Sequence, residues 1–71
     1  MSVSNETKRQ IIAEELRILE NTIYSFTLKG KIAGDVGNAE AQKNCMAQLE
    51  IFEKTKKGYM DELANLDKAG A

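Results

Sequence analysis

The sequence predicts an all-α protein, in which two helices form an antiparallel hairpin (an αα-hairpin) that completes a helical bundle by homo-oligomerisation. Three observations support this fold class. Apolar residues recur at alternating spacings of three and four in each half of the chain, a glycine-containing break separates the halves, and proline is absent. Such heptad-like spacing places each apolar set on one side of a helix, so each helix needs a partner to cover that side.

The first helix is expected over residues 5–33. Its apolar stripe consists of Ile12, Leu16, Leu19, Ile23 and Phe26. Ser4 or Thr7 can cap its amino end, because either side chain can accept a hydrogen bond from an unpaired backbone N–H group. Gly34 is the expected left-handed residue at its carboxyl end, since glycine has no Cβ atom to oppose that conformation.

Residues 34–37 form the predicted turn, and the second helix follows over residues 38–68. Asn38 is the expected amino-terminal cap of this helix, with Asp35 as the rival. The second stripe repeats the heptad spacing and contains one charged residue: Cys45, Leu49, Phe52, Lys56, Tyr59, Leu63 and Leu66.

A turn this short forces the two helices to run antiparallel, so that residues 1–71 form a single domain. The predicted register brings Ile12 near Tyr59 and Leu19 near Phe52. If this register holds, the two stripes cover one another along the length of the hairpin.

Apolar side chains also lie outside the two stripes. Ile11 and Ile18 flank the first stripe, while Met46 and Met60 flank one side of the second stripe and Ile51 lies near the other. Successive helical residues are about 100° apart, so this spread exceeds what one neighbouring helix can cover. A chain of 71 residues is also too small to be comfortably stable alone. We therefore expect a homo-oligomer, most simply a dimeric four-helix bundle, with trimers or larger rings as alternatives.

The charged residues narrow the classes of partner. Ten basic and eleven acidic side chains give a net charge of -1, which provides no general attraction for nucleic acid. No apolar run approaches the length of a bilayer span, and the first residues lack the pattern of a signal peptide. We expect a cytoplasmic protein that does not interact with membranes.

The residues that catalysis, metal or cofactor binding would need are not arranged for it. The chain has no histidine and one cysteine, Cys45, which lies in an apolar stripe and is expected to act as a small hydrophobe. The neighbouring carboxylates Glu14 and Glu15, like Asp61 and Glu62, point about 100° apart on a helix and do not converge on one substrate atom. We therefore predict a protein that is not an enzyme and holds no cofactor or metal.

One stretch of the second helix supplies the candidate face for a partner, a ligand or assembly: Ile51, Lys54, Lys56, Gly58 and Tyr59. Lys56 interrupts the apolar stripe, where a lysine either extends its ammonium group to water or has a role in ligand binding or register. Gly58 costs about 1 kcal/mol relative to alanine inside a helix. Either another group approaches closely there, or the glycine is simply tolerated at an exposed position.

Two alternatives to a protein-binding module remain open. Lys54, Lys56 and Lys57 form the densest basic cluster, and a two-helix chain that dimerises is comparable in length and topology to the RNA-binding Rop protein. Acidic residues four positions away favour local neutralisation instead, because Glu50 precedes Lys54 and Asp61 follows Lys57 at that spacing. The second alternative is an oligomer that closes a small-ligand pocket between protomers around Lys56 and Tyr59.

The centre of the chain carries a family resemblance. Within residues 28–53, a helix ends in GDVGN at 34–38, resumes with AEAQK at 39–43 and continues into the stripe LEIFE at 49–53. This stretch resembles small helical-hairpin proteins of tailed phages and prophages. The resemblance implies an accessory role through protein contacts, as a small virion or assembly component or as an inhibitor of a host system. The leading hypothesis is thus a non-enzymatic protein-interaction module that associates with itself and with another protein.

Overall fold

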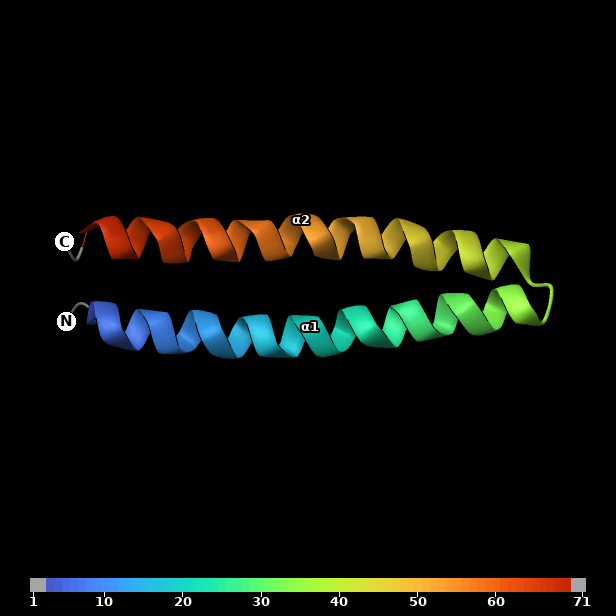
Figure 1. Cartoon of the computed structure of the whole chain (residues 1–71), viewed down its shortest axis with the longest axis horizontal. Helices are drawn as coiled ribbons and strands as arrows, with labels where there is room; N and C mark the ends of the chain where they lie inside the picture. The colour runs from blue at the N-terminus through green and yellow to red at the C-terminus, as the bar shows by residue number, and fades with distance from the viewer. Residues whose placement is uncertain (1–2, 70–71) are drawn as a thin grey trace.

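Residues 3–69, which the computed structural model describes, form two long helices. Helix α1 spans Asn5–Asp35 and helix α2 spans Ala39–Ala69, with 31 residues in each. The helices lie side by side and antiparallel, so the amino end of α1 and the carboxyl end of α2 are neighbours (Figure 1). The hairpin measures 51 × 18 × 15 Å. The predicted all-α, two-helix architecture is therefore confirmed for this part of the chain.

Each helix has a side-chain cap at its amino end. Ser4 Oγ accepts a hydrogen bond from the Thr7 backbone N–H at 3.2 Å, so Ser4 caps α1. At the start of α2, Asn38 Oδ1 accepts from the Ala41 backbone N–H at 3.1 Å. Asn38 is therefore the cap, and its rival Asp35 is the last residue of α1.

The carboxyl end of α1 differs from the prediction. Gly37, with a φ of 78°, takes the left-handed conformation that was expected at Gly34. The Asn38 N–H donates to the Ala33 carbonyl at 2.8 Å and the Gly37 N–H donates to the Gly34 carbonyl at 3.1 Å, which is the Schellman arrangement. This arrangement satisfies two carbonyls of the last turn, extends α1 to Asp35, and leaves Asn38 free to cap α2.

The two predicted stripes form the seam between the helices. All five residues of the first stripe and all seven of the second are partly buried. Gly30 and Ala33 continue the stripe of α1 toward the turn, and both are buried. A Cβ atom on Gly30 would lie 3.3 Å from Cys45 Cβ, so the helices approach closely there. In the middle of the seam, the Phe26 and Phe52 rings pack edge to face with centroids 5.1 Å apart.

The observed register differs from the predicted one by between one and two helical turns. Phe52 packs on Phe26, where the prediction placed it near Leu19, and Lys56 Nζ lies 3.9 Å from Glu20 Oε1. The turn accounts for part of the shift. Because α1 ends later and α2 begins later than predicted, each residue of α1 meets a residue further along α2.

The hairpin has almost no closed core. Within residues 3–69, Ala33, at 8% exposure, is the one buried residue with an apolar side chain, and no large side chain is fully buried. The accessible surface of the chain is 5444 Å². A compact monomer of 7.9 kDa would expose about 4400 Å². The hairpin therefore leaves about 1000 Å² more surface in water than a globular fold of this mass.

Candidate functional site

The structure places the five predicted site residues in different surroundings. Lys56 and Tyr59 are partly buried in the seam, whereas Ile51, Lys54 and Gly58 are exposed. Ile51 and Gly58 are seven residues apart and so lie on the same flank of α2, while Lys54 lies on the side of α2 that faces away from α1. The five residues therefore do not form a single site.

The outer surface of α2 carries locally paired charges. Lys54 Nζ lies 3.6 Å from Glu50 Oε1, and Lys57 Nζ lies 3.0 Å from Asp61 Oδ2. Both pairs have the four-residue spacing that the sequence predicted. Two of the three clustered lysines thus have a carboxylate beside them on their own helix.

One broad side of the hairpin is bridged by ion pairs between the helices. Arg9 Nη2 lies 2.9 Å from Asp67 Oδ1, and Lys56 Nζ lies 3.9 Å from Glu20 Oε1. The Lys56 side chain is 34% exposed, so its stem packs in the seam while its ammonium group reaches the edge. We call this side the ion-pair face.

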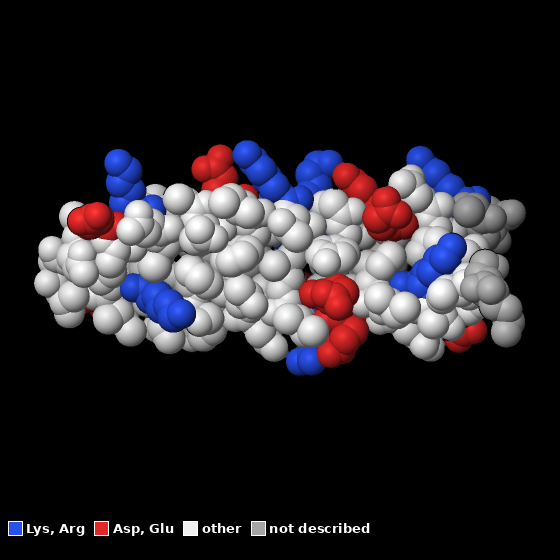
Figure 2. Space-filling model, turned by 180° about the vertical axis from the view of Figure 1, so that it is seen from behind, with Lys and Arg blue, Asp and Glu red and all other residues white. Residues whose placement is uncertain are grey.

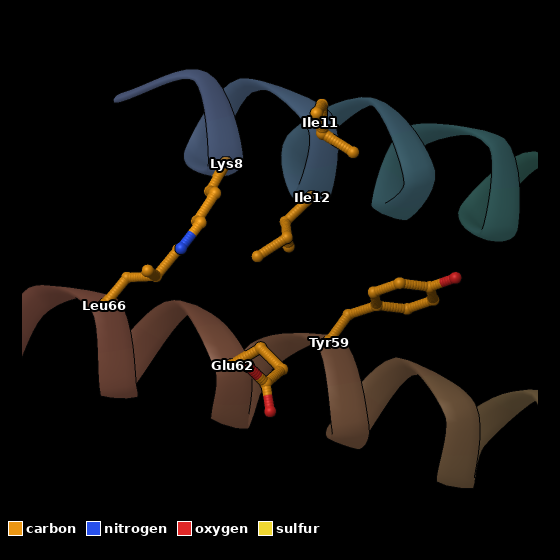
Figure 3. A pocket seen from close by; sticks show the side chains of 6 residues that line it. All are labelled: Lys8, Ile11, Ile12, Tyr59, Glu62 and Leu66. Atoms are coloured by element: carbon orange, nitrogen blue, oxygen red, sulfur yellow. The ribbon is translucent and has the colours of Figure 1, made fainter. Parts of the chain in front are cut away.

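The other broad side contains a groove between the helices. The groove has a volume of about 390 Å³ and is lined by Lys8, Ile11, Ile12, Tyr59, Glu62 and Leu66. Lys8 and Ile12 extend from α1 toward α2, and Leu66 and Tyr59 extend from α2 toward α1 (Figure 3). A second hollow continues along α2 beside Thr55 and Gly58, and it shares Tyr59 and Glu62 with the first.

Helical spacing shows that the groove and the ion pairs lie on opposite sides. Glu62 and Asp67 are five residues apart, which places them about 140° apart around α2, on either side of the seam. We call the side that contains the groove the groove face. On α1 it comprises Lys8, Ile11, Glu15, Ile18, Thr22, Ser25, Lys29 and Ile32, and on α2 it comprises Asn44, Gln48, Ile51, Thr55, Gly58, Glu62 and Asn65.

The middle of the groove face is uncharged. Ile18 is 47% exposed and Ile51 is 54% exposed. The Thr22 hydroxyl donates to the Ile18 carbonyl at 3.1 Å, and the Thr55 hydroxyl donates to the Ile51 carbonyl at 3.0 Å. Because both hydroxyls are satisfied within their own helices, burying these threonines against a partner leaves no unpaired donor.

The charged side chains are distributed unevenly over the surface. On the broad side seen in Figure 2, uncharged side chains cover much of the region between the helices, and charged side chains rise along the outer edge of α2. Such a division suits a module with one surface for packing and another that stays in water.

The glycines of the two helices differ in what surrounds them. A Cβ atom on Gly58 would meet nothing within 4 Å, in contrast to Gly30, whose Cβ would touch Cys45. The hairpin itself therefore gives no packing reason for a glycine at position 58, although glycine costs about 1 kcal/mol there.

A strong local ion pair lies outside both broad faces. Arg17 donates two hydrogen bonds to Glu14, from Nη2 to Oε1 at 2.6 Å and from Nε to Oε2 at 3.1 Å. These hydrogen bonds, with the charge of the guanidinium, lower the pKa of Glu14 from its ordinary value of 4.5 and raise the pKa of Arg17. The small stabilisation is thus present above pH 4.5 and is lost as the pH falls through the lowered pKa.

Sequence reasoning missed the threonine and serine part of the groove face. Together with the exposed isoleucines, these residues follow spacings of three and four along each helix: Thr22, Ser25 and Thr55. A search for apolar residues alone does not find this pattern, because their side chains are polar. The structure shows that the hydroxyls of the two threonines are bonded to backbone carbonyls of their own helices. Among residues 3–69, no three side chains of the metal-binding types come together as a candidate metal site.

Comparison of the chain with protein-family models, with curated proteins and with solved structures found no match. Neither helix of residues 3–69 contains an apolar stretch long enough to cross a membrane. The surface chemistry of the hairpin is what indicates its function.

Proposed function

We propose that this chain is a non-enzymatic protein-interaction module whose first partner is a second copy of itself, in a helical bundle. The observation that carries the proposal is the nearly open core: no large apolar side chain is fully buried within residues 3–69. Covering apolar surface stabilises a fold by about 25 cal/mol per Å². A partner that covers one broad face supplies burial that the hairpin lacks.

The dimensions of the hairpin support a dimer. One broad face measures 51 by 18 Å between Cα extremes. This corresponds to about 900 Å², close to the roughly 800 Å² that each partner buries in a standard protein interface. A single face is therefore large enough for a stable interface, and the opposite face remains available for another protein.

The phage resemblance supplies a biological setting for this proposal. In that setting the bundle is an accessory protein in the host cytoplasm, either a small virion or assembly component or an inhibitor of a host system. Its oligomeric core holds the hairpin together, and its exposed charged surface contacts the other protein.

The geometry favours neither alternative function. An RNA-binding surface would need unpaired cations, but Lys54, Lys56 and Lys57 each lie within 4.0 Å of a carboxylate. A ligand pocket around Lys56 and Tyr59 is also disfavoured. Tyr59 lines the groove, whereas the ammonium group of Lys56 lies beside Glu20 on the ion-pair face.

Light scattering of the purified chain tests self-association. We expect a particle mass that is a multiple of 7.9 kDa, with twice that value the simplest outcome. Because association and folding are linked, Tm should rise when the protein concentration is raised about a hundredfold. A cooperatively folded monomer whose Tm does not depend on concentration would contradict the proposal.

A further inference from the structure

We propose that the second copy docks through its own groove face, antiparallel to the first, on a twofold axis level with Thr22 and Thr55. This inference rests on the self-association proposed above and specifies its geometry. It assigns the groove, the unpaired charges of α1 and the open space at Gly58 to one interface between two copies of the chain.

The groove face is better suited to burial than the ion-pair face. Docking on the ion-pair face would remove water from the Arg9–Asp67 and Lys56–Glu20 pairs, and desolvation of charges opposes association. The middle of the groove face is uncharged and its threonine hydroxyls are already satisfied. Covering the middle of the groove face therefore gains apolar burial at little electrostatic cost.

The hairpin register sets the level of the axis. Glu20 contacts Lys56 across the seam, so Thr22, two residues after Glu20, and Thr55, one residue before Lys56, stand at about the same height. Both threonines lie near the middle of their helices. An axis at this level lets the two hairpins overlap along nearly their whole length.

Charge complementarity on α1 supports this axis. In an antiparallel pair on a twofold axis, a residue meets the one that lies equally far on the other side of the axis. Glu15 and Lys29 each lie seven residues from Thr22, so Glu15 faces the partner's Lys29, and symmetry repeats the pair. Neither residue takes part in the ion pairs within residues 3–69, and Lys29 Nζ lies over the Phe26 ring, 4.9 Å from its centroid.

The same axis gives Gly58 a role. Ile51 and Gly58 lie four and three residues from Thr55, so Ile51 comes opposite the partner's Gly58. A Cβ atom on Gly58 would meet nothing within 4 Å, so there is open space beside this residue. In the dimer, the exposed Ile51 side chain of the other copy fills that space. The dimer thus supplies the close approach that the isolated hairpin does not show.

The axis also places an apolar side chain over the groove. Ile11 and Ile32 lie eleven and ten residues from Thr22 on either side of it, so Ile11 meets the partner's Ile32. The two side chains are 52% and 51% exposed in the hairpin. The groove beside Ile11 and Tyr59 would therefore be covered by the turn end of the partner.

Charge reversal tests the predicted pair. Glu15→Lys and Lys29→Glu each place like charges across the interface twice, so each should raise the dimer dissociation constant about tenfold, measured by sedimentation equilibrium. The double variant exchanges the two charges and should return the dissociation constant to near the parent value.

The matched control lies on the outer surface of α2 and consists of Glu50→Lys and Lys54→Glu. Neither substitution should change the dimer dissociation constant. A double variant as weak as the single ones would overturn the proposed axis.

Cross-linking gives a second measurement that does not depend on charge. With Cys45 replaced by alanine, Thr55→Cys should form a disulfide between two copies under mild oxidation. Lys54→Cys in the same background is the control and should link far more slowly. Light scattering can show a dimer in which the double charge variant does not restore the dissociation constant and Thr55→Cys forms no disulfide. That result would overturn this geometry but would still support self-association. A folded monomer overturns both.

Discussion

Lys56 illustrates how a single charged residue can lie in an apolar seam. Its neighbours along the stripe, Phe52 and Tyr59, are partly buried, and so is Lys56 itself. The ammonium group extends to the ion-pair face, where Lys56 Nζ lies 3.9 Å from Glu20 Oε1. The Glu20 side chain is 61% exposed. The charge therefore remains partly hydrated, and its partner contributes little to stability.

Lys56→Met should raise the free energy of unfolding by about 1 kcal/mol, because the variant removes the cost of holding a charge beside the seam. Glu20 remains exposed and hydrated in the variant. Thermal melting checks this prediction at matched protein concentration. Lys54→Met is the control, since Lys54 is exposed on the outer surface of α2, and its Tm should stay near that of the parent. A lower Tm for Lys56→Met would show that the ion pair with Glu20 stabilises the hairpin.

At the scale of the elements, the turn determines how the two helices meet. The left-handed Gly37 ends α1, and Asn38 begins α2 immediately afterwards. The position of this one glycine sets the length of α1, and through it the residues that face one another across the seam. The small residues Gly30 and Ala33 then let the helices come close near the turn.

Gly37→Ala should lower the free energy of unfolding by about 1 kcal/mol or more, because a Cβ atom disfavours the left-handed backbone. Gly34→Ala is the informative comparison. Its new Cβ would meet only the flexible end of the Gln42 side chain, and alanine favours the helix by about 1 kcal/mol. Chemical denaturation should therefore give Gly34→Ala a free energy of unfolding equal to or higher than that of the parent. The free energy of unfolding of Gly37→Ala should be lower than that of the parent. The reverse order would mean that the chain turns at Gly34.

At the scale of the whole molecule, the stability of the hairpin depends on the narrow apolar seam between its two helices. The Phe26–Phe52 pair packs edge to face in the middle of that seam. Because the hairpin has almost no closed core within residues 3–69, each seam contact represents a large share of the total stability.

Phe52→Ala should cost about 3 kcal/mol and leave the protein largely unfolded at ordinary concentrations. Circular dichroism measures the loss of helix directly. The matched control is Met46→Ala, because Met46 is 63% exposed and lies outside the seam. Equal melting of the parent and Phe52→Ala would contradict the placement of Phe52 in the seam.

The sequence by itself determined the all-α hairpin, its two helices and the residues of the seam, since helical periodicity is a local property that apolar spacing reports directly. It did not determine which of two glycines, Gly34 or Gly37, would end α1. That choice depends on backbone hydrogen bonds across the turn, and it contributes to the register in which Phe52 packs on Phe26.

The candidate site was less accessible from the sequence, which grouped Ile51, Lys56 and Gly58 because they are close along one helix. Only the tertiary structure decided that Lys56 turns to one broad face while Ile51 and Gly58 lie toward the other. It also showed that Thr22 and Thr55 on the groove face have hydroxyls satisfied within their own helices. The physical reason is that a face of this hairpin is made by two helices together, and their rotation and register depend on contacts between residues far apart in the chain.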